Sequence, residues 1–262
     1  LQVEHPVTEM VTGLDLVEWQ LRVAAGEPLP MQQSAITLTG HAIEVRLYAE
    51  DPYTGFTPQT GKVLWWQPGR ALHGGAVGGG LGVRVDDGIA QGGEVSPFYD
   101  PMVAKVMAHG RDRNDAIRRL RAALVQTPLL GLRNNGRFLH DLLDTPEFRQ
   151  AQMTTSMLDQ WQVDGVPLLQ APKADDGVWA LAALAFVART GSAWHVSSVA
   201  AYDLALCCGT ERRTLRIAPS ANGSFVIGQG EGSENYQIDS FIDGVLRYKN
   251  ASCSRSAIAV FD

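Results

Sequence analysis

Two charged side chains of this sequence could take part directly in chemistry. Glu4 lies in the polar opening segment Gln2-Val3-Glu4-His5-Pro6, where a carboxylate could accept a proton. Arg84 lies on an alternating segment, where a guanidinium could stabilise a developing negative charge. A single glutamate or arginine is usually a solvated or ion-paired surface group, so each carries a function only as part of a wider motif. His5 is a further candidate base, but its place beside Pro6 favours a structural role.

Other residue types that often carry chemistry are poorly arranged for it. Cys207, Cys208 and Cys253 form no CxxC pair, so we expect no zinc site, no disulfide framework and a reducing, cytoplasmic compartment. The glycine-rich residues 74–80 are followed by no Lys-Ser or Lys-Thr pair, and a strand rather than a helix comes next. This pattern predicts a hairpin connection and not a phosphate-binding loop. We expect no metal site in the chain.

Composition limits the class of protein. The chain has 262 residues, 45% of them hydrophobic and 19% charged, which is typical of a soluble globular protein with one large or two ordinary domains. Its formal net charge of -6 does not favour a nucleic-acid partner, and the basic residues between 111 and 121 predict a solvated helix face. Because no apolar run reaches the roughly 20 residues that span a bilayer, we also expect no membrane partner.

The first 165 or so residues mix strands and helices in the manner of an α+β fold. The opening nine residues read as a strand end that Pro6 interrupts. A helix should start between Thr12 and Asp15 and stop at Gly26. Alternating and apolar runs predict strands at residues 42–48, 62–66, 81–85 and 102–108. A helix capped by Asn114 should follow, and its apolar face should hold Ile117, Leu120 and Leu124.

The last third of the chain has a different composition and predicts a second domain. Turn-forming residues at 163–167 and 172–177 indicate a linker. Beyond it, residues 178–189 predict one apolar helix. Six short strands should follow, at 203–207, 214–217, 224–227, 235–238, 244–248 and 257–261. One helix beside several antiparallel strands indicates a small, barrel-like α+β module.

Four motifs in the first 165 residues together resemble biotin carboxylase, an ATP-grasp ligase. They occur in the order expected of that enzyme and are Gln2-Val3-Glu4-His5-Pro6-Val7-Thr8-Glu9, Gly40-His41-Ala42-Ile43-Glu44-Val45-Arg46 with Ala49-Glu50-Asp51-Pro52, Gly82-Val83-Arg84, and Tyr99-Asp100-Pro101-Met102-Val103-Ala104-Lys105. Phe98-Tyr99-Asp100-Pro101-Met102 and the following module are most similar to the α subunits of acyl-CoA carboxylases of the 3-methylcrotonyl-CoA or geranyl-CoA type.

The resemblance implies a domain assignment. Residues 1–165 would form the C-terminal domain of biotin carboxylase, with the last ATP-grasp segment at residues 1–12. Residues 175–262 would form the linker domain between biotin carboxylase and biotin carrier, which they resemble only loosely. The chain would then be a fragment, because a complete enzyme also needs an N-terminal domain, a nucleotide site and a biotin-attachment motif.

The resemblance also implies residue roles in a two-step reaction. In that reaction ATP activates bicarbonate as carboxyphosphate, and the carboxyl group then passes to the ureido nitrogen of biotin. Glu4 matches the general base that removes the bicarbonate proton. Gln2 and the backbone of Val3 match positions that orient bicarbonate together with Glu4. Arg84 matches the arginine that binds biotin and stabilises negative charge on its ureido oxygen.

Cofactors and partners follow from the same resemblance. Biotin would arrive on a carrier domain outside this chain, and ATP and Mg²⁺ would act in the full-length enzyme, with none expected bound here. The partners would be the carboxyltransferase β subunit, the biotin carrier domain and a second copy of the chain, which would dimerise through residues 1–165. The isolated chain should be inactive. The alternative is a non-catalytic module for dimerisation and subunit docking, in which Glu4 and Arg84 are vestigial.

Overall fold

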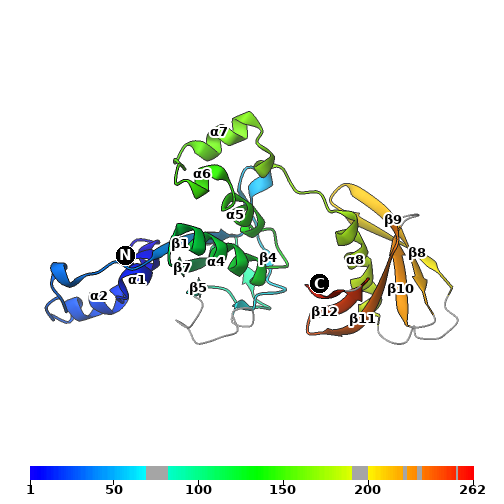
Figure 1. The fold of residues 1–262 in the computed structure, drawn as a ribbon, viewed down its shortest axis with the longest axis horizontal. Helices are drawn as coiled ribbons and strands as arrows, with labels where there is room; N and C mark the ends of the chain where they lie inside the picture. Colours follow the sequence, from blue (N-terminus) through cyan, green and yellow to red (C-terminus); the bar gives the residue numbers. More distant parts are fainter. Residues whose placement is uncertain (69–81, 191–199, 221–222, 229–231, 252) are drawn as a thin grey trace. The chain divides into compact units, whose positions relative to one another are not determined.

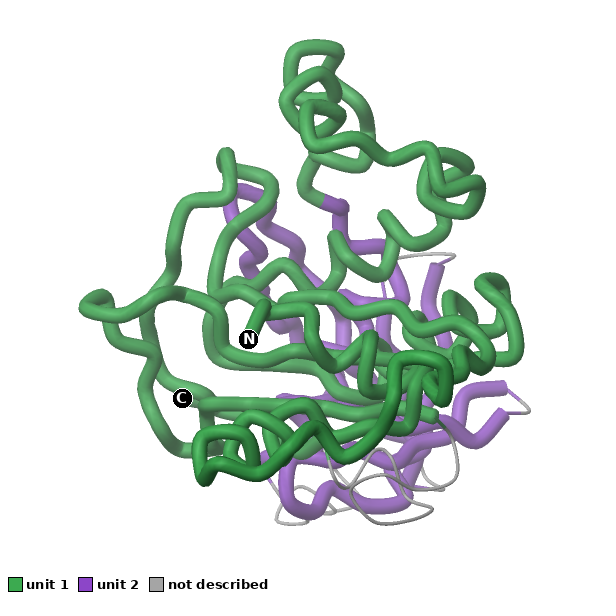
Figure 2. The backbone as a smooth tube through the Cα atoms, turned by 90° about the vertical axis from the view of Figure 1, so that its left-hand side faces the viewer, with its two compact units in different colours: residues 1–171, 262 green, residues 172–261 purple. Residues whose placement is uncertain are grey.

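The computed structural model describes residues 1–68, 82–190, 200–220, 223–228, 232–251 and 253–262. They form two compact units, residues 1–171 with Asp262 and residues 172–261 (Figure 2). The glycine-rich residues 74–80, predicted as a hairpin connection, lie outside the described residues. Within the described part, no helix is long and apolar enough to cross a membrane. Cys207, Cys208 and Cys253 are exposed and unbridged.

A three-stranded antiparallel sheet is the centre of the first unit (Figure 1). Its strands are β1 (His41–Tyr48), β7 (Met102–Gly110) and β5 (Val83–Asp87), in the order β1-β7-β5. β1 pairs with β7 from His41↔Gly110, and β5 pairs with β7 from Val83↔Ala108. The strands predicted near residues 42–48 and 102–108 are confirmed, and β5 begins two residues later than predicted and runs on to Asp87.

The apolar face of this sheet packs against helix α4 (Arg113–Gln126). Ile117 and Leu120 of α4 are fully buried there, together with Val106 of the central strand. Alternation along β5 puts Val83 and Val85 on the same face, as predicted. The helix N-cap is Asp112 rather than Asn114, because the Asp112 carboxylate accepts the backbone N–H of Asp115.

The remaining elements of the first unit are short. They are α1 (His5–Thr12), α2 (Leu16–Ala24), η1 (Gln33–Ala35), β2 (Glu50–Asp51), η2 (Pro52–Thr54), β3 (Thr57–Pro58), β4 (Gly61–Lys62), β6 (Glu94–Val95), α5 (Gly136–Leu142), α6 (Pro146–Arg149), α7 (Met157–Asp164) and η3 (Pro167–Leu169). The predicted strand at residues 62–66 is wrong beyond Lys62, since Trp65 makes only an isolated bridge with Leu130. Trp65 and Trp66 are buried core residues.

The opening nine residues are not a strand end. Residues His5–Thr12 form helix α1, and Pro6 lies in its first turn. Proline is tolerated there because the first N–H groups of a helix have no partner within the helix, and its fixed φ suits the helical backbone. A helix that follows does begin where predicted, because Asp15 caps α2 by accepting the backbone N–H of Glu18 at 2.8 Å.

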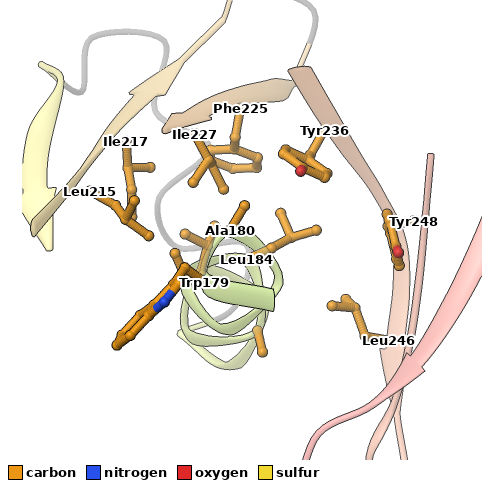
Figure 3. Close-up of a cluster of buried hydrophobic side chains, with 13 residues drawn as sticks. Trp179, Ala180, Leu184, Leu215, Ile217, Phe225, Ile227, Tyr236, Leu246 and Tyr248 are labelled. Carbon is orange, nitrogen blue, oxygen red and sulfur yellow. The ribbon is translucent and has the colours of Figure 1, made fainter. Parts of the chain in front are cut away.

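The second unit is a six-stranded antiparallel meander packed on one helix. The helix is α8 (Asp176–Arg189), and the strands, in the order β13-β12-β11-β10-β9-β8, are β8 (Tyr202–Cys208), β9 (Glu211–Pro219), β10 (Ser224–Gly228), β11 (Glu234–Ile242), β12 (Val245–Asn250) and β13 (Cys253–Ile258). Leu184 of α8 lies in the core with Ile217 and Leu246 (Figure 3). The strand pairs of the described residues include none between β8 and β13, so they form an open sheet and do not close the barrel-like module that the sequence predicts.

Candidate functional site

The face of the three-stranded sheet opposite α4 carries charged side chains. We call it the polar face and define it by Glu44 and Arg46 of β1, Lys105 of β7, and Arg84 and Asp86 of β5. The strand register sets them in two rows. One row runs Arg46, Lys105, Asp86, and the other places Glu44 and Arg84 on either side of Met107. Helix α1 and the residues before it lie on this face, because their groups bond to three of its charged side chains.

Glu4 meets the polar face at strand β1. Its Oε2 accepts a hydrogen bond from Arg46 Nη2 at 3.2 Å, which is also an ion pair. The Glu4 side chain is 55% exposed, so solvent and a small anion can reach it. Glu4 is also the N-cap residue of α1, although its side chain does not cap the helix. An accessible carboxylate at the start of a helix, with its geometry fixed by an arginine, is suited to proton transfer.

The two residues before Glu4 are fixed through backbone carbonyls. Val3 O accepts a hydrogen bond from Lys105 Nζ at 3.1 Å. Gln2 O lies 2.8 Å from His5 Nδ1, which supports a structural role for His5. The Gln2 side chain is exposed. The three residues predicted to bind bicarbonate, Gln2, Val3 and Glu4, are consecutive. The backbone carbonyls of Gln2 and Val3 are held by hydrogen bonds to His5 and Lys105.

Arg84 is held on the polar face by two carboxylates. Its Nε and Nη2 donate to Asp86 Oδ1 and Oδ2, both at 2.8 Å, and its Nη1 donates to Glu9 Oε2 at 2.6 Å. A guanidinium has five N–H donors, so these three bonds leave one hydrogen on each terminal nitrogen. Bonding to Asp86, and then to Glu9, raises the pKa of Arg84 above its usual value. The side chain is 32% exposed and permanently cationic.

Glu9 connects Arg84 to the helices above the sheet. Its carboxylate is 8% exposed, and its second oxygen accepts the backbone N–H of Leu16, the first residue of α2, at 2.9 Å. A buried carboxylate needs such partners, because an unpaired charge in this environment is very costly. Glu9 therefore ties α1, α2 and β5 together and holds Arg84 in one orientation.

Glu44 is the member of the polar face with the poorest hydrogen bonding. Its Oε2 is buried and has no hydrogen-bond partner among the described residues. Burial raises the pKa of Glu44, while the nearby positive charges of Lys105 and Arg46 oppose that rise.

Glu4 and Arg84 do not contact each other directly. Arg46, the partner of Glu4, stands on β1, and Arg84 stands on β5, with β7 between them. Neighbouring strands lie about 4.8 Å apart, so the two outer strands are separated by about 10 Å.

Sequence reasoning missed the residues that hold the predicted pair. Arg46, Glu9 and Lys105 appear in the motifs without a role, and Asp86 lies outside the motifs. A signal was available, since residues 44 and 46, 84 and 86, and 105 alternate with apolar neighbours in three strands. No group of three His, Cys, Asp or Glu side chains able to hold a metal occurs among the described residues.

Comparison with known proteins shows which family this chain resembles. Residues 44–160 match the model of the biotin carboxylase C-terminal domain, and residues 1–32 match the ATP-binding domain of the carbamoyl-phosphate synthase L chain. The resemblance to the biotin carboxylase C-terminal domain that the sequence predicts is thus confirmed over residues 44–160.

Several of the similar curated proteins are acyl-CoA carboxylase α subunits. The chain is 46% identical over 167 residues to the methylcrotonoyl-CoA carboxylase subunit alpha of Mus musculus, covering 64% of this chain and 22% of that protein. It is 44% identical over 186 residues to the propionyl-CoA carboxylase alpha chain of Ruegeria pomeroyi, covering 67% of this chain and 27% of that one. The chain therefore spans about a quarter of the length of these relatives.

Solved structures agree with this assignment. The biotin carboxylase domain of the 2-oxoglutarate carboxylase of Hydrogenobacter thermophilus is 35% identical, with a TM-score of 0.58. The match covers 66% of this chain and 35% of that one, whose structure is a dimer in complex with MgADP, ADP and bicarbonate.

Proposed function

We propose that the first unit supplies the bicarbonate and biotin end of an ATP-dependent biotin carboxylase, within an acyl-CoA carboxylase α subunit. The observation that carries the proposal is the polar face, which brings the segment Gln2–Glu4 and the guanidinium of Arg84 to one side of one sheet. The similarity to α subunits of methylcrotonoyl-CoA and propionyl-CoA carboxylases supports the substrate class, and the choice of acyl group stays open.

At one end of the polar face, the segment Gln2–Glu4 would bind bicarbonate. Glu4 would take the proton of the bicarbonate hydroxyl as a bicarbonate oxygen attacks the terminal phosphate of ATP, and ADP leaves. Gln2 and the Val3 backbone orient the anion by hydrogen bonds, which raises the rate through positioning. Arg46 Nη2 donates to Glu4 Oε2 at 3.2 Å and so holds the carboxylate in place.

At the other end, Arg84 would bind the biotin of a carrier domain. Biotin would supply the ureido nitrogen that receives the carboxyl group, and the phosphate released from carboxyphosphate would take the proton that this nitrogen loses. The two remaining hydrogens of the Arg84 guanidinium can donate to the ureido oxygen, which becomes negative as the nitrogen becomes nucleophilic. Because Asp86 and Glu9 already fix the guanidinium, little reorganisation is needed when that charge develops.

The polypeptide of residues 1–262 by itself should have no biotin carboxylase activity. Its match to an ATP-binding domain model is confined to residues 1–32, and the described residues bring together no potential metal site. We expect no bicarbonate-dependent ATP cleavage above background from the purified polypeptide. We call a polypeptide that joins residues 1–262 to a complete ATP-binding domain the complete chain. In the same assay, the complete chain should cleave ATP in a bicarbonate-dependent manner. Comparable rates from residues 1–262 alone and from the complete chain would contradict the proposal that ATP cleavage also needs the ATP-binding domain.

We propose that the second unit docks the carboxyltransferase β subunit and that the first unit mediates dimerisation. The second unit has its own core around α8, which supports an independent role. Deleting residues 172–261 from the complete chain should abolish co-purification with the β subunit and leave bicarbonate-dependent ATP cleavage within about 3-fold of the unchanged protein. Retained co-purification would place the docking surface elsewhere.

A further inference from the structure

Lys105 is a charged residue in the middle of a sheet. It lies on the central strand β7, and its side chain is 14% exposed. The register places it directly opposite Arg46 of β1, which has the same charge. Like charges at directly opposed positions are unfavourable, and a mostly buried ammonium needs partners. For packing of the sheet alone, an uncharged residue at position 105 would be more favourable.

The partners of Lys105 come from both ends of the site. Its Nζ donates to Val3 O at 3.1 Å and lies 3.8 Å from Asp86 Oδ2. Asp86 in turn holds Arg84 through two hydrogen bonds. A continuous series of polar contacts therefore runs from the backbone of residue 3, through Lys105 and Asp86, to the Arg84 guanidinium.

Glu44 does not take the place of these partners. Its buried Oε2 has no hydrogen-bond partner among the described residues, so it is not bonded to Lys105. Burial raises the pKa of the Glu44 carboxyl, and the nearby charge of Lys105 opposes that rise. The other charged groups that face Glu44 are Arg46, His5 and Glu4. The Lys105 ammonium donates its hydrogen bond to the Val3 carbonyl and pairs with Asp86.

We propose that Lys105 is a positioning residue for bicarbonate: it anchors the Val3 carbonyl so that residues 2–4 present the anion and the base in a fixed geometry relative to Arg84. The inference rests on the function proposed above. Fixing the carbonyl sets the rotation of the Val3–Glu4 peptide, and with it the point where the Glu4 side chain leaves the backbone. Lys105 acts through these groups and does not itself touch the reacting atoms.

The test is a kinetic comparison in the complete chain without biotin. Lys105→Met keeps the aliphatic stem and removes the donor. We expect the KM for bicarbonate in ATP cleavage to rise about 10-fold to 100-fold, the loss typical of a hydrogen bond to a charged group, and kcat to fall as Glu4 loses alignment. The KM for ATP should stay within about 2-fold. Lys105→Arg, which keeps a cationic donor, should recover part of the bicarbonate affinity.

Controls separate positioning from folding. Lys62→Met removes a lysine of the same unit that is 67% exposed, and it should leave both KM values unchanged. A purely structural role would lower the active fraction, and thus kcat, while the KM for bicarbonate stayed at its original value. That outcome in Lys105→Met would overturn the inference. If the unchanged complete chain shows no bicarbonate-dependent ATP cleavage, the proposed function itself has failed, so the two failures are distinguishable.

Discussion

Replacing Glu4 with glutamine in the complete chain should lower bicarbonate-dependent ATP cleavage by about 10²-fold to 10⁴-fold, the range typical of a lost general base. An amide has nearly the same shape and can still accept a hydrogen bond from Arg46, but it cannot take the bicarbonate proton. The fold should be kept, because the Glu4 side chain is 55% exposed and its ion pair with Arg46 lies at the surface. Steady-state phosphate release at saturating bicarbonate measures the effect.

Glu18→Gln is the matched control for this variant. Glu18 is 53% exposed and forms an ion pair with Arg22 at 2.7 Å, so the substitution removes the same charge from a comparable environment. Its activity should equal that of the unchanged protein. If Glu4→Gln retained activity within about 3-fold, Glu4 would not be the base, and the non-catalytic assembly module would become the better account.

Replacing Arg84 with methionine should separate the two half-reactions. Carboxylation of biotin should fall by about 10²-fold to 10³-fold, the loss expected when a preorganised donor to a developing oxyanion is removed. Bicarbonate-dependent ATP cleavage without biotin should change much less, because the Glu4 carboxylate pairs with Arg46 on β1, and β7 lies between β1 and the β5 strand of Arg84. Both rates can be followed with labelled bicarbonate and free biotin.

Arg84 also stabilises the fold, so its substitution needs a companion. Its loss leaves the Glu9 carboxylate, which is 8% exposed, without its cationic partner. Breaking a fully buried ion pair costs about 3–5 kcal/mol, and we expect less here because Arg84 is partly exposed. Adding Glu9→Gln should restore the melting temperature but not the carboxylation of biotin. Recovery of carboxylation in this double variant would show that Arg84 acts through stability alone.

The elements that sequence reasoning predicted best have a strong internal pattern. Strands β1 and β7 and helices α4 and α8 were predicted from alternation or from apolar periodicity, which encodes the face each one buries. The opening residues were misassigned because Pro6 suits the first turn of a helix as well as a break. The strand prediction near Trp65 was wrong because a run of residues buried on both sides has the same sequence pattern as a strand. Among the described residues, Trp65 forms only one isolated bridge.

The candidate site was predicted in part. Gln2, Val3, Glu4 and Arg84 came from motif resemblance, and their roles are still proposals. The residues that hold them could not be paired from the sequence, because Glu4 and Arg46 are 42 positions apart and Val3 and Lys105 are 102 apart. Such pairs are decided by the register of three strands, and a shift of one residue would turn every side chain to the other face.

The central claim is that two chemically distinct ends of one site lie on the polar face. Its most direct test measures bicarbonate-dependent ATP cleavage and biotin carboxylation side by side in the complete chain, for the unchanged protein, Glu4→Gln and Arg84→Met. The account predicts that Glu4→Gln loses both activities, whereas Arg84→Met loses carboxylation and keeps ATP cleavage. The account would be contradicted if both variants lost both activities to the same extent, or if neither variant lost either activity.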